Sequence, residues 1–216
     1  GVVDGLSLIG TQAEVQISAS PDQLKNCREI LYHKCSKSTF DGFLTFVIGE
    51  NGMDLASKFG LPSNKIIKTG NWVGPLLVDA ANNGVRKLLL FGYHGKLVKL
   101  SGGVFHTHHH LADGRLEILT SLAVKEAISF DLIKLISRST SVENALLTLE
   151  ASSPEAVSLI WGRMAREIEI KSCSYVNRYV SSSMEIGSVL FDRKRQIRWA
   201  GFDGLKQINS LGLILK

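Results

Sequence analysis

Side chains that bind anions are concentrated in one stretch of the sequence, between Gly92 and Glu117. A glycine-flanked turn, Gly92–Gly95, is followed by Lys96 and Lys99, by a run of histidines and by the charged segment Asp113–Glu117. Lysine, arginine and protonated histidine form charge-assisted hydrogen bonds with carboxylates and phosphates. The stretch therefore predicts a site for an anionic small molecule.

The glycine-flanked segment resembles a phosphate-binding loop only superficially. Two residues separate Gly92 from Gly95, and Leu97 stands where a hydroxyl that binds magnesium is needed. We therefore exclude nucleotide hydrolysis.

The histidine run has three possible interpretations. In an extended segment His106, His108 and His110 would project from one face and could bind zinc or iron together. Alternatively, the imidazoles contact a polar ligand, or they lie on the surface without a function. We favour contact with a polar ligand and expect no bound metal. In the same way, Asp113 could simply cap a helix that begins near Gly114, with Arg115 and Glu117 solvated.

Two further loops are marked by glycines. Gly49–Gly52 follows an apolar run, and Glu50 or Asp54 could accept hydrogen bonds from ribose hydroxyls or an ammonium group. Alternatively, the loop is a tight turn in which Asn51 or Asp54 caps the following helix. In the segment Thr69–Gly74, Asn71 is a candidate helix cap, and Trp72 is either a core residue or a stacking surface for a ring.

The elements that position these loops follow a regular order. Strands are expected at Leu6–Ile9, Phe43–Ile48, Ile66–Ile67 and Lys87–Phe91, with helices between them. Because these runs are continuously apolar, they indicate a three-layer α/β fold with a mostly parallel sheet and helices on both faces.

Beyond Gly114 the pattern becomes helical. Helices are expected at Leu116–Ile128, Leu132–Ile136, Val142–Leu149 and from Pro154 to about Tyr179. A late strand, Ser188–Phe191, returns to the sheet or forms a hairpin with Ile197–Ala200. We expect a single domain over residues 1–216, in which residues 1–130 carry the site and residues 131–216 are mostly helical.

Composition limits the classes of partner. The net charge is +5, but basic residues are scattered, and the one basic run, Arg193-Lys194-Arg195, is expected to be a solvated turn. The three cysteines are an odd number without metal or disulfide spacing, and they indicate reduced thiols. No run of eighteen apolar residues and no signal peptide is found. We therefore expect a cytoplasmic protein that binds neither nucleic acid nor membranes.

Three segments together, Gly92–Leu100, Thr107-His108 and Ala112–Leu119, resemble the cobalt-precorrin-5B C1-methyltransferase family of anaerobic cobalamin biosynthesis. The resemblance extends to Gly5–Thr11 and Gly70–Gly74 and covers about the first 130 residues. It implies a Rossmann-like topology and transfer of a methyl group from S-adenosylmethionine to carbon C1 of a cobalt-containing corrin precursor. It also implies that the protein supplies no nucleophile, because alignment and desolvation dominate such a displacement.

The resemblance implies roles for particular residues. The loops that would hold S-adenosylmethionine contribute Gly49, Glu50, Asn51, Gly52, Asn71 and Gly74. The acetate and propionate groups of the tetrapyrrole would be bound by Lys96, Lys99, His106, Thr107, His108 and Arg115. Asp113 and His108 are the candidate catalytic residues; Asp113 or Glu117 would orient Arg115 or accept a proton.

The sequence departs from the family in one respect. Members of the family carry a further N-terminal region rich in Gly, Thr and Ala, so we expect a fragment, or a chain that needs another domain or a second copy. Two alternatives stay open: a non-catalytic module that binds tetrapyrroles, and a metal-dependent hydrolase built on the histidines.

Overall fold

A five-stranded sheet organises the chain, for which a computed structural model describes residues 2–3, 6–7, 21–49, 52–108 and 113–215. The strands follow the order β4-β3-β5-β6-β7. They are β3 (Phe43–Ile48), β4 (Ile66–Lys68), β5 (Lys87–Tyr93), β6 (Glu185–Phe191) and β7 (Ile197–Ala200). The first four are parallel and β7 is antiparallel to β6, which confirms the predicted α/β class with a mostly parallel sheet.

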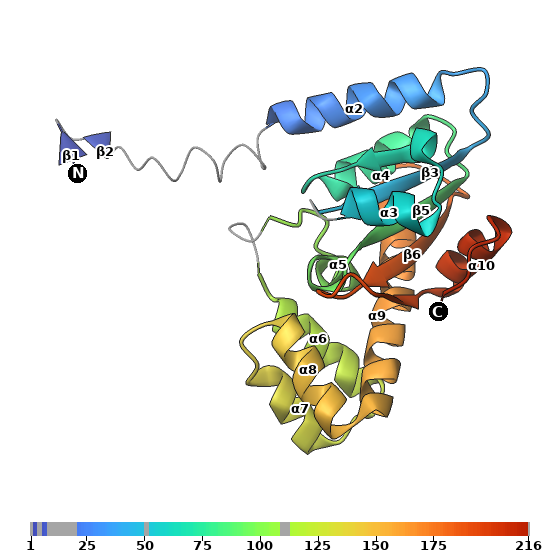
Figure 1. The fold of residues 1–216 in the computed structure, drawn as a ribbon. Coiled ribbons are helices and arrows are strands. Elements are labelled where there is room, and N and C mark those ends of the chain that lie inside the picture. The colour runs from blue at the N-terminus through green and yellow to red at the C-terminus, as the bar shows by residue number, and fades with distance from the viewer. Residues whose placement is uncertain (1, 4–5, 8–20, 50–51, 109–112, 216) are drawn as a thin grey trace.

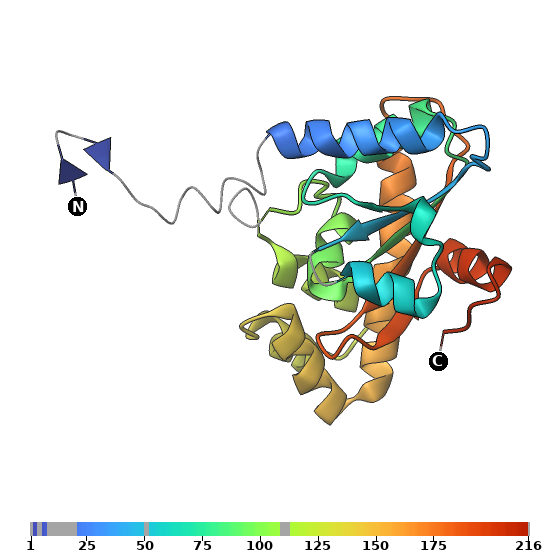
Figure 2. The same cartoon turned by 45° about the horizontal axis from the view of Figure 1, so that its top comes forward.

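Alternate residues of the central strands enter two separate cores. Phe46, Leu88 and Leu90 pack with α2 (Pro21–Cys35), α4 (Val73–Asn82), α5 (His94–Ser101) and α9 (Pro154–Val176). Val47, Leu89 and Phe91 pack with α3 (Met53–Phe59) and α10 (Phe202–Ser210). Since neighbouring side chains of a strand point to opposite faces, helices cover both faces of the sheet (Figures 1 and 2). This arrangement explains why the strands are continuously apolar.

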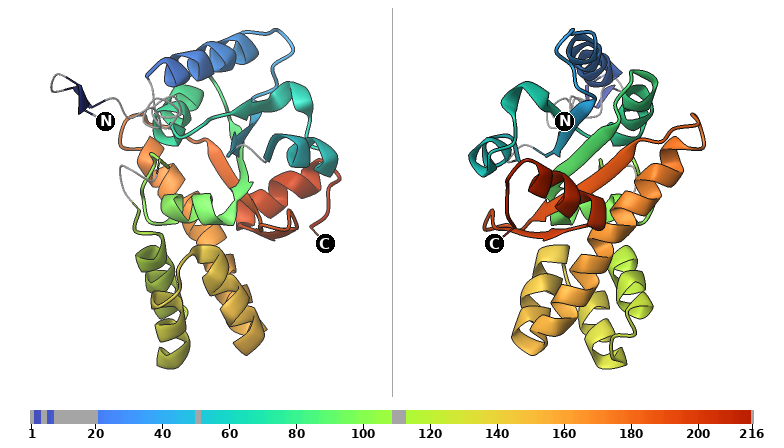
Figure 3. Two further views of the ribbon diagram at one scale, coloured as in Figure 1. Left: turned by 60° about the vertical axis from the view of Figure 1, so that its left-hand side comes forward. Right: turned by 90° about the vertical axis from the view of Figure 1, so that its right-hand side faces the viewer.

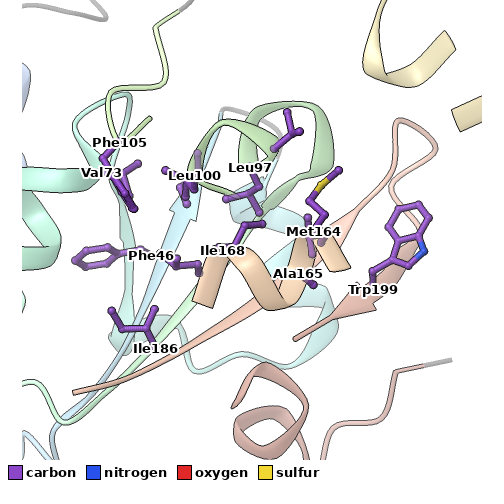
Figure 4. Close-up of a cluster of buried hydrophobic side chains, with 14 of the residues drawn as sticks. Phe46, Val73, Leu97, Leu100, Phe105, Met164, Ala165, Ile168, Ile186 and Trp199 are labelled. Carbon is purple, nitrogen blue, oxygen red and sulfur yellow. The ribbon is translucent and has the colours of Figure 1, made fainter. Parts of the chain in front are cut away.

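The larger core is organised by α9, a helix of 23 residues. Figure 4 shows its residues Met164, Ala165 and Ile168 among side chains from the sheet and α5, such as Phe46 and Leu97. The amino-terminal part of α9 joins α6 (Arg115–Lys125), α7 (Phe130–Ser137) and α8 (Val142–Ser152) in a helical unit below the sheet (Figure 3). These four helices lie where the sequence predicts them, with small shifts of their ends.

Serine caps explain two of the helix starts. The Ser141 side chain accepts a hydrogen bond from Asn144 N at the start of α8, and Ser153 accepts one from Ala156 N at the start of α9. Pro154 occupies the first turn of α9, where its missing N–H leaves no bond unmade.

The start of the chain and the segment after β5 differ from the sequence-based expectations. The first two residues of the expected strand Leu6–Ile9 form β2 (Leu6–Ser7), which pairs with β1 (Val2–Val3) in a separate two-stranded sheet; Leu8 and Ile9 lie outside the described residues. The turn expected at Gly92–Gly95 is wrong. β5 continues through Gly92, where a Cβ would lie 2.9 Å from Ile48 O, and α5 begins at His94.

The late strand satisfies both expected alternatives. β6 pairs in parallel with β5, where Lys87 lies opposite Glu185, and it also forms an antiparallel hairpin with β7. A single-residue irregularity interrupts this hairpin between Leu190 and Phe191.

In the part of the chain that the structure describes, none of the helices has the length and apolarity needed to cross a membrane.

A buried carboxylate joins α9, β6 and α10. The two oxygens of Glu169 accept backbone N–H bonds from Ser188 at 3.0 Å, Gly204 at 2.8 Å and Asp203 at 3.2 Å. Gly201 lies so close that a Cβ there would overlap the carboxylate. Burial raises the pKa of Glu169 to about 7, and the three N–H donors oppose this shift only partly.

Glu169→Gln should therefore change how stability depends on pH. The pKa of Glu169 is about 7 in the folded state against 4.5 for an ordinary glutamate. The folded protein thus binds this proton more tightly than the unfolded chain does. The stabilisation that the bound proton gives is complete below pH 4.5 and is lost as pH rises through 7. Between about pH 5 and pH 8, the free energy of unfolding of the wild type should fall by roughly 3 kcal/mol at most relative to that of the variant. Urea denaturation at several pH values measures this difference.

Glu155→Gln, which changes an exposed glutamate in the first turn of α9, is the matched control and should show no such trend. A stability difference between wild type and Glu169→Gln that is the same at every pH would contradict the prediction.

Candidate functional site

The carboxyl ends of β4, β3, β5 and β6 meet at one edge of the sheet. From β3 the chain crosses to β4 on one side and later to β5 on the other, so the strand order reverses between β3 and β5. Ligands of open α/β sheets bind in the crevice at such a reversal. A cavity of about 370 Å³ lies here, and we call it the switch-point cavity. Its lining residues are Ile48, Gly49, Tyr93, Lys96, Ser141, Glu143, Phe191, Asp192, Arg193 and Arg195.

A larger cavity of about 600 Å³ lies at the opposite edge, where Phe43, Lys87 and Glu185 begin their strands. We place the functional site in the switch-point cavity instead, because binding sites of this fold class form at the carboxyl ends of strands.

Three cationic side chains line the switch-point cavity. Lys96 comes from the first turn of α5, and a Cβ at Gly49 would be 3.7 Å from its Cδ, so this side chain lies beside the loop after β3. Arg193 and Arg195 come from the turn between β6 and β7, and Arg195 donates to Asp54 on α3 at 2.5 Å. The basic run is therefore exposed, as predicted, but it also forms one wall of the cavity, which the sequence did not indicate.

A hydrogen-bonded group of four side chains lies beside this cavity. Glu143 Oε2 is 2.9 Å from His94 Nε2 and accepts a bond from the Tyr93 hydroxyl at 3.1 Å. On the other side of the imidazole, Trp161 Nε1 donates to His94 Nδ1 at 2.9 Å. Burial lowers the pKa of the fully buried His94 more than Glu143 raises it, and burial also raises the pKa of Tyr93.

Sequence reasoning missed this group. His94 lies between two glycines directly after the clearest predicted strand, which was the available signal. Glu143 is 49 residues away in the chain, in the first turn of a helix where acidic residues are common. No spacing pattern connects residues so far apart.

A second set of predicted residues forms the contacts between the loop after β4 and the histidine segment. Thr107 donates from its hydroxyl to Asn71 Oδ1 and from its backbone N–H to Asn71 O, both at 3.0 Å. Gly74 N donates to Phe105 O at 3.0 Å, and a Cβ at Gly74 would be 2.7 Å from Tyr175 Oη. The idea that Asn71 caps a helix is wrong, because α4 has Trp72 at its N-cap without a side-chain bond.

Lys99 holds the same segment from α5. Its buried ammonium group donates to the carbonyl oxygens of Thr107 and His108, each at 3.3 Å. Burial lowers the pKa of Lys99, an effect that nearby Asp113 partly opposes. Lys99 therefore positions the histidine segment.

The described histidines do not form an extended metal-binding row. Residues 104–108 adopt no regular secondary structure, and the His106 and His108 rings are 6.4 Å apart. His106 packs edge-on against Trp72 at 4.4 Å, and burial lowers its pKa. His109 and His110 lie outside the described residues. Over residues 21–49, 52–108 and 113–215, no group of three His, Cys, Asp or Glu side chains is placed to hold a metal ion.

Asp113 and Arg115 form a two-bond ion pair at the start of α6. Arg115 donates from Nε to Oδ1 at 2.5 Å and from Nη2 to Oδ2 at 2.8 Å, and this contact lowers the pKa of Asp113. The helix is capped by Gly114 without a side-chain bond, so the alternative that Asp113 caps it is wrong. Arg115 and the exposed Glu117 line a smaller cavity of about 200 Å³, which shares Ser141 with the switch-point cavity.

The loop after β3 is only partly described. Gly49 has a φ of 103° and lines the switch-point cavity, while Gly52 stands at the N-cap of α3. The two candidates between them, Glu50 and Asn51, lie outside the described residues. The structure thus places Gly49 and Lys96 together, Asn71 with Thr107, and Asp113 with Arg115.

Comparison with known proteins identifies the chain. Residues 106–201 match the family model described as "CbiD, C-terminal domain". Over all 216 residues, the chain is 86% identical to "Cobalt-precorrin-5B C(1)-methyltransferase" of Prochlorococcus marinus strain NATL1A. It is 55% identical, over 213 residues, to the protein of that name from strain MIT 9313. The chain belongs to this family. It spans 57% of the length of the first relative and 56% of the second. No solved structure matches the chain.

In this CbiD-family chain, the bonding of His94 predicts its protonation state. An indole N–H can only donate, so His94 Nδ1 must be unprotonated and Nε2 must carry the hydrogen that Glu143 accepts. We expect nitrogen-detected NMR to show His94 as the neutral Nε2–H form from about pH 6 to 8. A His94 nitrogen signal that moves between these pH values would contradict the assignment.

Proposed function

We propose that the protein carrying this chain transfers a methyl group to carbon C1 of cobalt-precorrin-5B. The observation that carries the proposal is the 86% identity, over all 216 residues, to a relative with that name. The cationic switch-point cavity supports it, because this substrate carries several acetate and propionate groups that cationic side chains bind.

The carboxylates of the substrate have several partners along the cavity. Lys96, Arg193 and Arg195 line the cavity itself, and Arg115 lines the smaller cavity that adjoins it at Ser141. Of the other proposed substrate residues, His106, Thr107 and His108 belong to the segment that Asn71 and Lys99 hold in place, and Lys99 reaches this segment from α5. Asp113, proposed as catalytic, acts by fixing the guanidinium of Arg115. His108 remains the second catalytic candidate.

S-Adenosylmethionine is the proposed methyl donor, and it supplies an electrophilic methyl group on a sulfonium. The cavity's residues fit its chemistry: the positive φ of Gly49 allows close backbone approach, and Tyr93 and Phe191 are aromatic. Glu50, Asn51 and Gly52 would continue the contact along the loop after β3, and Asn71 and Gly74 would support it from the loop after β4. The reversal of strand order also supports a Rossmann-like classification.

The chain's own contribution is alignment and exclusion of water. A displacement at a methyl group needs the attacking carbon, the methyl carbon and the leaving sulfur in line, and a rigid cavity supplies that order.

The three cysteines are free thiols, which supports a cytoplasmic location.

A binding and transfer experiment tests this function. Isothermal calorimetry should show binding of S-adenosylhomocysteine, and label from S-adenosylmethionine should appear in the methylated product of cobalt-precorrin-5B.

Lys96→Met should raise the KM for the tetrapyrrole by roughly 10-fold or more, because a charge-assisted hydrogen bond is lost. Lys134→Met, at a partly exposed position on α7, is the matched control and should not change KM.

Two outcomes would count against the proposal. Absence of both binding and transfer would overturn it. Binding of a corrinoid without binding of S-adenosylhomocysteine would instead indicate a non-catalytic tetrapyrrole-binding module.

A further inference from the structure

Glu143 has an unusual environment for a glutamate in the first turn of a helix. Such residues are normally solvated, where they interact favourably with the helix dipole. The side chain of Glu143 is only 12% exposed, yet it lines the switch-point cavity. Desolvating a carboxylate is expensive unless donors compensate, so this placement requires an explanation.

The donors that compensate Glu143 are both neutral and both bind the same oxygen. Tyr93 and His94 donate to Oε2. His94 can do so only from Nε2, because the Trp161 indole occupies Nδ1 as a donor. Neither of these bonds uses Oε1. The carboxylate is therefore oriented through one oxygen, and the residue as a whole lines the switch-point cavity.

The other titratable side chains around the cavity are unsuited to accept a proton. Lys96, Arg193 and Arg195 are cations, and Tyr93 keeps its proton because burial raises its pKa. Asp192 is committed to the β6–β7 hairpin, where it accepts a bond from Gln196 N at 2.9 Å and lies 3.5 Å from Arg198. His94 is fully buried behind Glu143. Among the described lining residues, Glu143 is the group with a free basic oxygen.

We propose that Glu143 is the proton acceptor of the methyl transfer, with Oε1 as the basic atom. The assignment rests on the proposed function. Tyr93, His94 and Trp161 are positioning residues that hold Oε2 and thereby aim Oε1.

The step is balanced with the reactants already named. The substrate carbon forms a bond to the methyl carbon, the bond from that carbon to sulfur breaks, and its electron pair remains on sulfur as a neutral thioether. The methylated substrate has gained one positive charge, which it loses as a proton to Glu143 Oε1. The resulting carboxylic acid keeps both hydrogen bonds at Oε2 and releases its proton to water before the next cycle begins.

The test compares variants of the protein that carries this chain, with labelled S-adenosylmethionine and cobalt-precorrin-5B. Glu143→Gln should lower kcat on the order of 10²–10⁴-fold, the usual range for loss of a general base. KM and the affinity for S-adenosylhomocysteine should stay within about threefold, because shape and the bonds at one oxygen are retained. Glu150→Gln is the matched control: it lies two turns along α8, pairs with Arg198 and does not line the switch-point cavity.

Chemical rescue separates a base from a structural carboxylate. Glu143→Ala leaves a space in which formate can replace the missing group, so added formate should restore part of kcat in this variant and none in Glu143→Gln. This readout does not depend on equal stability of the variants, because the same protein is compared with and without formate.

The outcomes distinguish the two levels of the proposal. If the wild type transfers no methyl group, the proposed function and the role of Glu143 both fall. If the wild type is active and Glu143→Gln retains its kcat, or if formate restores nothing to Glu143→Ala, only the role of Glu143 is overturned.

Discussion

The parallel pairing of β5 with β3 on one side and β6 on the other is the constraint from which the site follows. It aligns Ile48 with Gly92 and Tyr93 with Phe191, so segments from three distant parts of the chain end side by side. Six successive residues of β5 are apolar or glycine, with helices packed on both faces. Burial on this scale fixes the strand's register, and the register fixes which side chains meet at the carboxyl edge.

Buried polar groups then join the helices to this sheet. Glu169 ties α9 to β6 and α10, and Trp161 ties the same helix to the first residue of α5 through His94. Each of these groups is desolvated and therefore stabilises the fold only with its partners in place. One long helix thus sets both the packing of the sheet and the orientation of a residue at the cavity.

Features that depend on local sequence were predictable. The runs around Phe46 and Leu89 indicated buried parallel strands, and the start of α9 at Pro154 followed from its sequence signals. The strand expected at Leu6–Ile9 is seen at Leu6–Ser7 but pairs outside the five-stranded sheet, because a short apolar run does not specify its pairing partner. The position of Lys96 at the carboxyl edge was predictable, because it lies a few residues after a strong strand. Glu143 and Arg195 were not, because their approach to Lys96 depends on where α8 and β6 dock, which is a property of tertiary packing.

The bond between His94 and Glu143 joins two parts of the molecule, since His94 begins α5 beside the sheet and Glu143 belongs to the helical unit. The cavity is complete only while these parts are docked. Any molecule that binds to both walls must favour the docked arrangement by its own binding free energy, and tight docking must in turn strengthen its binding. Binding at the site and docking of the two parts are therefore one linked equilibrium. Substitutions where α5 packs against α6 would change affinity without touching the ligand.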